Sequence, residues 1–260
     1  MSLRWWAGES MTKHITKEGR APELTTTQDV ATIRFQRPGE HNRIDPGDIP
    51  VLRGFLSRIE SQEEMRLVVF TGAGEETFSS GYTIEAILDR LDRSFEDLLD
   101  AIEAFPLPTL CALNGSIYGG ATDLALCCDF RIGVLGSRMF MPAARFGLHY
   151  YPGGLRRYVS VVGVAQAKRI FLTAQALDAE EMLRIGFLTE LLDRSHLQSR
   201  VDAYASALRD CEPRVVRSMK RQLRAIAARD EDVAASREDY ESSLASTALK
   251  ERLAAVTAKQ

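Results

Sequence analysis

The sequence predicts an α/β fold with parallel strands, followed by a helical C-terminal part. In the first half of the chain, short β-branched segments alternate with segments of helical periodicity, a pattern typical of helices that connect parallel strands. After Gly154 the strand-like segments give way to helix-like ones. With 260 residues, 45% of them apolar, the chain can bury a sizeable core, which suits one α/β domain with a helical extension.

The expected strands are short runs rich in Val, Ile and Phe that end at turn-forming residues. Pro38-Gly39 follows the first of them, and Asn114-Gly115 follows the third. The segments expected to form strands are 30–36, 67–71, 109–113 and 130–135.

The expected helices have apolar residues on one face or clear end signals. Pro50 suits a first helical turn, Pro106 ends a helix, and Asp178 is an N-cap candidate with Glu181 three residues later. The last segment is amphipathic, so its apolar stripe either packs on the core or mediates self-association. The segments expected to form helices are 50–60, 84–91, 95–104, 123–128, 163–175, 178–185, 196–211, 213–229 and 236–256.

Charge and composition argue against several classes of function. The net charge is −3 and most basic residues are scattered, which does not favour nucleic-acid binding. No apolar run approaches the roughly 18 residues that a membrane span requires. Residues 1–20 lack the apolar region of a signal peptide, and we expect them to form a poorly ordered extension.

The cysteines and histidines do not have the spacing of metal or disulfide sites. Cys127 and Cys128 lie in an apolar stretch, which predicts buried thiols and a reducing, cytoplasmic location. The 4 histidines are far apart, so no metal site is expected.

The stretch NGSIYGGATDLALCCD, which covers 114–129, places Gly119 and Gly120 before a helix. The first N–H groups of a helix lack internal partners, and glycine lets a ligand approach them closely. The alternative is a tight turn that needs glycine for a positive φ. A second loop, FSSGYTIEAI over 78–87, also places a glycine ahead of a helix. One donor from each loop would form an oxyanion hole for a thioester carbonyl.

These loops belong to five ordered blocks through which the chain resembles the crotonase superfamily, the enoyl-CoA hydratase/isomerase family. The resemblance is clear from about residue 30 to 193. The blocks are RPGEHNRID (37–45), LVVFTGAGEETFSSGYTIEAI (67–87), PTLCALNGSIYGGATDLALCCDFRI (108–132), FGLHYYPGGLRRYVSVVG (146–163) and LTAQALDAEEMLRIGFLTELL (172–192).

The resemblance implies a spiral of ββα turns over 21–195 and a C-terminal helical region over 196–260 that forms trimers or a dimer of trimers. It implies acyl-CoA substrates and no cofactor beyond the coenzyme A of the substrate. The two oxyanion donors carry over onto the backbone N–H groups of Tyr82 and Gly120. The Tyr82 side chain replaces a small residue, and it either narrows the acyl channel or points away from it.

The catalytic acids of the family carry over less well. A hydratase of this family adds water with two glutamates. Asp123 stands at the first of these positions and Ala143 at the second. The resemblance to dienoyl-CoA isomerases, which have Asp at the first position, fails at Ala143 and at Tyr151, where they carry acids.

A third comparison is with superfamily decarboxylases that act on methylmalonyl-CoA-type substrates and use a tyrosine. Tyr150 stands at that position, with His149 and Tyr151 beside it. Alternatively, this aromatic cluster lines an apolar acyl pocket or packs at a trimer interface. Asp123 also has two interpretations, because an acid in the first turn of a helix is favourable without any catalytic role.

The resemblance also implies where coenzyme A would bind. The expected contacts are Arg43, the loop Gly81–Ile84, Gly119 and Lys259, with Ala143 and Tyr151 at the acyl end. Other arginines that could contact its phosphates are Arg37, Arg156 and Arg157. The sequence therefore predicts an acyl-CoA enzyme that stabilises a thioester enolate, with Asp123 as the remaining acid. The alternatives are a malonyl-type decarboxylase that uses Tyr150 and His149, or a non-catalytic acyl-CoA-binding protein.

Overall fold

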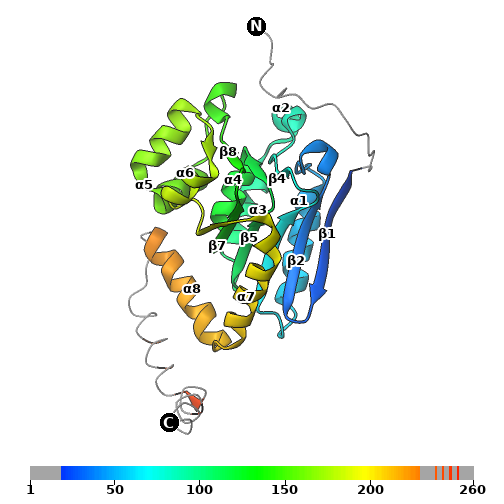
Figure 1. Ribbon diagram of the computed structural model, residues 1–260, viewed down its shortest axis with the longest axis vertical. Helices are drawn as coiled ribbons and strands as arrows, with labels where there is room; N and C mark the ends of the chain where they lie inside the picture. The colour runs from blue at the N-terminus through cyan, green and yellow to red at the C-terminus, as the bar shows by residue number, and fades with distance from the viewer. Residues whose placement is uncertain (1–18, 229–237, 239–241, 243–245, 248–250, 252–260) are drawn as a thin grey trace.

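The computed structural model describes residues 19–228 and the single positions 238, 242, 246, 247 and 251 (Figure 1). The strands in this part of the chain are β1 (Arg20–Thr27), β2 (Val30–Gln36), β3 (Leu67–Gly72), β4 (Thr77–Ser79), β5 (Thr109–Leu113), β6 (Ser116–Tyr118), β7 (Phe130–Val134), β8 (Arg138–Phe140), β9 (Leu177–Asp178) and β10 (Glu190–Leu192). The α-helices are α1 (Asp48–Glu60), α2 (Ile87–Arg90), α3 (Arg93–Glu103), α4 (Gly120–Cys127), α5 (Pro152–Thr173), α6 (Ala179–Arg184), α7 (Leu197–Arg209) and α8 (Pro213–Ala228). The short 3-10 helices are η1 (Pro38–Glu40), η2 (Ile84–Ala86), η3 (Ala143–Phe146) and η4 (Arg194–His196).

The strands form two sheets. The 6-stranded sheet has the order β1-β2-β3-β5-β7-β10, and the 4-stranded sheet has the order β4-β6-β8-β9. All pairs from β2 to β10 in the larger sheet are parallel, and β1 pairs antiparallel with β2 at its edge. Figure 1 shows β1 and β2, in blue, at one side and α5 and α6 at the other.

A repeating unit links the two sheets. In each repeat, one strand of the larger sheet is followed by one strand of the smaller sheet and then by a helical segment, as in β3-β4-η2, β5-β6-α4 and β7-β8-η3. This is the spiral of ββα turns that the motifs predicted. Because equivalent points in successive repeats stack, the loop after β4 and the loop after β6 lie next to each other.

Both faces of the larger sheet are buried at its central parallel strands β3 and β5. Every residue of β3 is buried. Val68 and Phe70 belong to the main core cluster, while Leu67 and Val69 pack with Val201 of α7 in a second cluster. The alternation along β3 therefore directs successive side chains to helices on opposite faces.

The buried thiols expected from the sequence are present. Cys111, Cys127 and Cys128 are free and buried, and Cys211 is exposed. Burial raises the pKa of the Cys111 and Cys127 thiols well above the usual value, which keeps them protonated. These cysteines act as small apolar core residues.

Most predicted elements agree with the structure. The strands expected over 30–36 and 109–113 have those bounds, and those expected over 67–71 and 130–135 differ by one residue. The N-cap expected at Asp178 is confirmed, because its side chain accepts a hydrogen bond of 2.8 Å from the Glu181 N–H.

The helix expected over 163–175 is present to within about two residues, but sequence reasoning missed the helix that precedes it. That segment is the second half of α5, which begins at Pro152 and contains a non-helical Gly163 with φ 75° and ψ 159°. Gly153 and Gly154 have low helix propensity and hid the true start. Proline, with its fixed φ, suits a first helical position.

The short strands β4, β6 and β8 and the polar edge strand β1 were also missed. Strands of three residues have too few positions for a period-2 pattern, and β1 is mostly exposed. Because β1 begins at Arg20, it starts at the edge of the extension predicted over 1–20, of which 1–18 lie outside the described residues.

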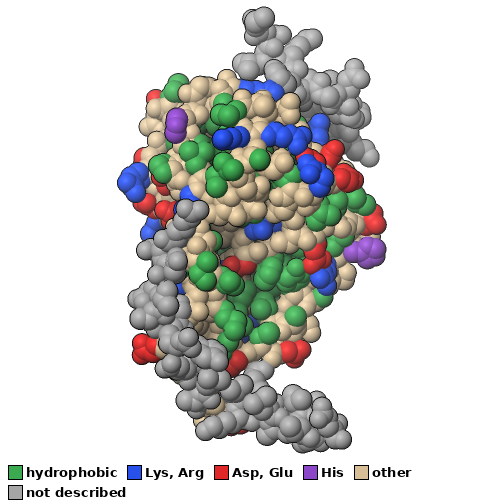
Figure 2. Space-filling model, turned by 90° about the vertical axis from the view of Figure 1, so that its left-hand side faces the viewer, with side chains coloured by type: hydrophobic (Ala, Val, Ile, Leu, Met, Phe, Trp, Pro, Cys, Tyr) green, Lys and Arg blue, Asp and Glu red, His purple; other side chains and the backbone are tan. Residues whose placement is uncertain are grey.

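The C-terminal helices lie at the periphery of the molecule. Figure 2 shows the face that carries α5, α6 and α8, with hydrophobic side chains gathered on it. Met219, Leu223 and Ile226 of α8 form one exposed apolar stripe at a helical spacing. Trimerisation through this region stays a prediction, and most of the helix predicted over 236–256 lies outside the described residues.

Candidate active site

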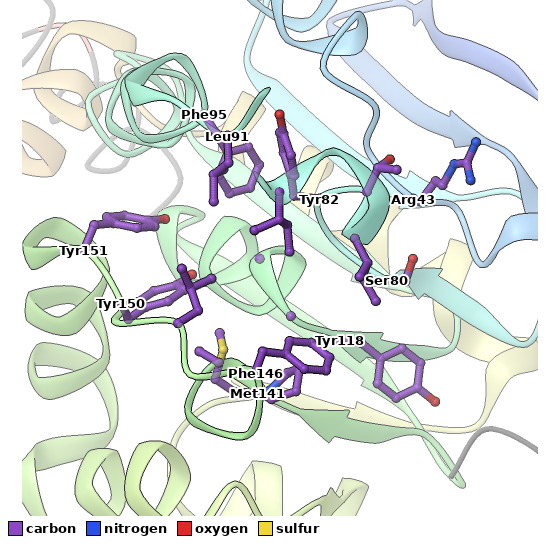
Figure 3. Close-up of a pocket in the computed structure, with 18 of the residues that line it drawn as sticks. Arg43, Ser80, Tyr82, Leu91, Phe95, Tyr118, Met141, Phe146, Tyr150 and Tyr151 are labelled. Atoms are coloured by element: carbon purple, nitrogen blue, oxygen red, sulfur yellow. The ribbon is translucent and has the colours of Figure 1, made fainter. Parts of the chain in front are cut away.

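A cavity of about 830 Å³ lies between the two glycine loops. Figure 3 shows Arg43 at one end and Tyr150 and Tyr151 at the other, with Tyr82 between them. Gly119 and Gly120 also line the cavity. The loop after β4 and the start of α4 therefore form its middle, and the loop before α5 forms the tyrosine end.

The two glycine loops pack backbone against backbone. Gly81 has φ +80° and Gly119 has φ +52°, a region that favours glycine. A Cβ on Gly81 would lie 2.5 Å from the backbone nitrogen of Gly120 and 2.9 Å from the carbonyl oxygen of Tyr118. The loops approach this closely because glycine has no side chain at their contact.

The contact brings the backbone N–H groups of Tyr82 and Gly120 together. A Cβ on Gly120 would lie 3.6 Å from the Tyr82 nitrogen. Ile44 holds the Tyr82 loop, because its N–H donates to the Gly81 carbonyl at 2.8 Å and its carbonyl accepts from the Thr83 N–H at 3.0 Å. Gly120 begins α4, so its N–H has no acceptor within the helix. Within the described part of the chain, neither the Tyr82 nor the Gly120 N–H has a hydrogen-bond partner.

The Tyr82 side chain lies beside Leu91 and Phe95 (Figure 3). Its hydroxyl donates to the Arg90 carbonyl at 2.7 Å, and its ring contacts Phe95 edge-on at 5.4 Å. Burial raises the pKa of this hydroxyl. Phe95 in turn covers Gly120, where a Cβ would lie 2.9 Å from the phenyl ring. Tyr82 and Phe95 both line the cavity, so whether Tyr82 narrows the acyl channel stays a prediction.

Asp123 belongs to a buried ion pair. The Asp123 and Arg157 side chains are 0% and 1% exposed. Arg157 donates from Nε to Oδ1 at 2.8 Å and from Nη2 to Oδ2 at 3.0 Å, and the Tyr151 hydroxyl also donates to Oδ2. The third nitrogen of Arg157 lies 2.8 Å from Asp100 and 3.0 Å from Glu103. Burial alone would lower the pKa of Arg157, but its hydrogen bonds to Asp123 and Asp100 and the neighbouring negative charges together outweigh burial, so the pKa is raised.

Two tyrosines separate Asp123 from the cavity. Among the described residues that line the cavity, Tyr150 and Tyr151 are present and Asp123 is not. The two rings stack with their centroids 4.6 Å apart and their planes 28° from parallel. At Gly154, a Cβ would collide with the Tyr150 ring and lie 2.9 Å from Asp123 Oδ2. The first turn of α5 thus packs tightly on both the acid and the ring that covers it.

The tyrosine hydroxyls at this end are neutral. Burial, with the negative charge of Asp123, raises the pKa of both Tyr150 and Tyr151, and burial also raises the pKa of Tyr158. The Tyr158 hydroxyl shares a hydrogen bond with Thr122. The Tyr150 hydroxyl is buried and has no hydrogen-bond partner among the described residues. A buried hydroxyl in this state costs on the order of 1–3 kcal/mol.

Comparison with known proteins places the chain in a family. A family model described as enoyl-CoA hydratase/isomerase matches residues 25–255. The chain belongs to the enoyl-CoA hydratase/isomerase family. The short-chain-enoyl-CoA hydratase of Clostridium acetobutylicum is 28% identical over 201 residues, which cover 75% of this chain and 77% of that protein. The crotonyl-CoA hydratase of Syntrophomonas wolfei is 27% identical, over 71% of this chain and 74% of that protein.

Solved structures support the fold. The crystal structure of an enoyl-CoA hydratase from Bacillus anthracis aligns with a TM-score of 0.84 at 22% identity, covering 93% of this chain and 97% of that one. Pseudomonas aeruginosa DspI aligns with a TM-score of 0.85 at 24% identity, covering 95% and 98%. The crotonase fold predicted from the five sequence blocks is confirmed.

Several residues predicted from the family pattern line the cavity. Ala143, which the sequence predicts at the family's second acid position, is buried at the start of η3 and supplies no carboxylate. Ile84 is 50% exposed at the rim. His149 also lines the cavity, and its Nδ1 lies 2.7 Å from the Tyr150 carbonyl oxygen, which accepts only if Nδ1 carries the proton. The roles predicted for these residues stay predictions.

The arginines expected near coenzyme A mostly make internal ion pairs. Arg43 lines the cavity and lies 2.9 Å from Glu40. Arg37 lies 2.5 Å from the buried Asp48, and Arg156 lies 2.5 Å from Glu103. The predicted contact Lys259 lies outside the described residues.

Sequence reasoning missed two residues that shape the site. Phe95 was placed on a helix but not over Gly120, and Arg157 was considered only as a surface contact for phosphate. The apolar spacing of Phe95, Leu98, Leu99 and Ile102 could have indicated a face of α3 that packs on the glycine loops. For Arg157 the sequence carries no such signal, because a buried and an exposed arginine look alike in it.

The described residues contain no group of three or more His, Cys, Asp or Glu side chains that could hold a metal ion. None of the helices in the described part of the chain is both long enough and apolar enough to cross a bilayer.

Proposed function

We propose that this protein processes acyl-CoA thioesters and stabilises a thioester enolate with the backbone N–H groups of Tyr82 and Gly120. Membership of the enoyl-CoA hydratase/isomerase family supports an acyl-CoA-processing enzyme. The observation that carries the proposal is the pair of unpartnered N–H groups, one from each glycine loop, on the wall of one cavity.

Such a pair suits the chemistry of a thioester. When a proton or a carboxylate leaves the carbon next to the carbonyl, negative charge moves onto the carbonyl oxygen. Two fixed N–H donors stabilise that charge without reorganising, and one of them also lies at the positive end of α4. Removal of one donor of this type typically costs about 10²–10³ in kcat.

The acid positions argue against two-carboxylate hydration in this chain. Ala143 has no group that transfers a proton. Both oxygens of Asp123 accept hydrogen bonds from Arg157, and one also accepts from Tyr151. A proton-transfer group must come within hydrogen-bond reach of the substrate. The substrate's side of the cavity instead carries the rings of Tyr150 and Tyr151.

The test is a panel of acyl-CoAs assayed by mass spectrometry. Because curated relatives are named crotonyl-CoA and short-chain-enoyl-CoA hydratases, crotonyl-CoA is the first substrate to assay. We expect its hydration to be at least about 10²-fold slower than that by the Syntrophomonas wolfei enzyme assayed alongside, since general acid–base catalysis contributes about this much. Hydration at a comparable rate would contradict the argument from Ala143.

A second candidate reaction is decarboxylation of a malonyl-type acyl-CoA, supported by the buried Tyr150 hydroxyl that has no partner. In this reaction the bond between the carboxylate and the α-carbon breaks and carbon dioxide leaves. The electron pair forms the enolate held by Tyr82 and Gly120, and a proton then adds to the α-carbon. The enzyme would need no second carboxylate.

Malonyl-CoA and methylmalonyl-CoA in the same panel test this candidate. Carbon dioxide release that is lost in Tyr150→Phe would support decarboxylation, and unchanged release would assign the hydroxyl no part in it. Retained acyl-CoA binding without turnover of any substrate would favour the non-catalytic alternative.

A further inference from the structure

Both carboxylate oxygens of Asp123, the residue at the family's first acid position, accept hydrogen bonds from other side chains of the protein. Asp123 Oδ1 accepts from Arg157, and Oδ2 accepts from both Arg157 and the Tyr151 hydroxyl. The carboxylate is 0% exposed, and Arg157 is itself held by Asp100 and Glu103. A group bound in this way is suited to hold its neighbours in place.

The neighbour that Asp123 holds is part of the cavity wall. Its hydrogen bond fixes the end of the Tyr151 side chain, and the Arg157 guanidinium lies 5.9 Å from the centroid of the same ring. Tyr150 stacks on Tyr151 at 4.6 Å, and its other contacts include Phe171, 5.2 Å away. Contacts therefore run without a gap from Arg157 through Asp123 and Tyr151 to Tyr150.

The position of this wall is opposite to the charged end of the cavity. Arg43 and its partner Glu40 line one end, the unpartnered N–H groups lie between, and the stacked tyrosines close the other (Figure 3). The phosphates of coenzyme A require the charged, open side. The acyl chain of a thioester held at the N–H groups would therefore extend toward Tyr150 and Tyr151.

We infer that Asp123 is a positioning residue that, together with Arg157, locks Tyr151 and the stacked Tyr150 as an end wall limiting the length of the acyl chain. The inference rests on the proposed acyl-CoA function and assigns a specificity role to its site. It makes the family's first acid position a support for the wall and not a proton-transfer group. Thioesters with short acyl chains are the class of ligand that such a pocket would take.

The experiment measures the affinity for saturated acyl-CoAs of 4, 6, 8, 10 and 12 carbons by calorimetry. Each buried methylene is worth about 0.8 kcal/mol, or roughly fourfold in affinity. We expect affinity to rise along the series until the chain reaches the wall and then to fall by about tenfold or more. In Tyr150→Ala, which removes the wall, the best chain should be longer by at least about two carbons.

Variants of Asp123, Tyr151 and Arg157, here called the lock variants, test whether Asp123 positions the tyrosine wall. Tyr151→Phe keeps the ring but removes the bond to Asp123, and Asp123→Asn weakens the same bond. Both should flatten the fall at long chains without weakening the binding of butyryl-CoA more than about twofold. Arg157→Lys, which keeps the charge but not the two-point contact, should have a smaller effect than Asp123→Asn.

A control separates the shape of the wall from other effects. Arg156→Gln removes the neighbouring arginine, which contacts Glu103 but makes no hydrogen bond to Asp123, and its chain-length profile should match the wild type.

Three outcomes would overturn the inference. The first is a wild-type affinity that keeps rising to 12 carbons. The second is a profile that is identical in Tyr150→Ala, Tyr151→Phe and the wild type. The third is an equal loss at every chain length in the lock variants, which would indicate a role in stability alone. If no acyl-CoA of any length binds, the proposed function fails, and the inference that rests on it falls too.

Discussion

The guanidinium of Arg157 on α5 binds both carboxylate oxygens of Asp123 on α4, at 2.8 Å and 3.0 Å. The two residues are 34 positions apart in the sequence, and both side chains are buried. The structure therefore ties the residue that the sequence predicts as the remaining acid to a cation. The pair joins two helices at the tyrosine end of the cavity.

Removing either member of this pair should cost stability, but by different amounts. In Asp123→Asn, Arg157 keeps Asp100 and Glu103 as partners, so we expect a loss of about 1–3 kcal/mol. In Arg157→Met, Asp123 stays buried and, among the described residues, keeps the Tyr151 hydroxyl as its one side-chain partner, so the loss should be about 3–5 kcal/mol. Urea unfolding of both variants measures the difference.

The double variant Asp123→Leu/Arg157→Met tests whether an unpaired buried charge causes the loss of stability in Arg157→Met. It replaces the ion pair by apolar groups and should recover most of the loss seen in Arg157→Met, since no buried charge is left unpaired. Arg156→Gln, with its side chain 35% exposed, should change stability by less than about 1 kcal/mol. Equal losses of unfolding free energy in Asp123→Asn and Arg157→Met would contradict the prediction that losing Arg157 costs more stability than losing the Asp123 charge.

The contact between the glycine loops predicts a strong effect of Gly81→Ala. The new methyl group would lie 2.5 Å from the Gly120 nitrogen at a φ of +80°, so the Tyr82 and Gly120 N–H groups must move apart. We expect kcat on whichever acyl-CoA the panel identifies to fall by about 10²–10³. Gly54→Ala is the matched control, because its methyl group meets nothing within 4 Å inside α1. A Gly81→Ala enzyme with wild-type kcat would refute the two-donor site.

The buried tyrosines predict a loss of stability at alkaline pH. Burial raises the pKa of Tyr150, Tyr151 and Tyr158 in the folded protein above the value of about 10 of a free tyrosine. Above pH 10 the unfolded chain therefore releases protons that the folded chain retains, and the free energy of unfolding falls as pH rises. Below pH 10 these hydroxyls are protonated in both states and contribute no pH dependence.

Unfolding by urea between pH 8 and pH 11 checks this prediction. Tyr150→Phe removes one of the hydroxyls, so its stability relative to the wild type should improve as the pH rises past 10. Parallel curves for the two proteins over this range would show that Tyr150 does not titrate differently on unfolding.

Much of the fold and part of the site could be predicted from the sequence. The central strands were found because β3 and β5 are continuous apolar runs with clear ends. The glycine loops were found because Gly81 and Gly119 each stand directly before a helical segment. Strand runs and glycine loops depend on the identity of neighbouring residues, so they can be predicted from the sequence.

The rest depends on contacts that a local pattern does not contain. The sequence does not say whether Tyr82 turns into the channel, because the Arg90 carbonyl that takes its hydroxyl is positioned by another part of the fold. The first half of α5 was hidden by Gly153 and Gly154, whose lack of side chains leaves room for Tyr150 and Arg157. A low helix propensity there reflects tertiary packing.

By itself, the sequence determined the α/β class, the two glycine loops and the crotonase resemblance, because strand runs and glycine positions are properties of neighbouring residues. It also predicted Asp123 at the first of the family's two acid positions and Ala143, which carries no acid, at the second. Only the tertiary structure decided what the Asp123 carboxylate faces. Its partners, Arg157 and Tyr151, reach it from α5 and the residue before α5, and a side chain's surroundings are set by whichever distant segment packs against it.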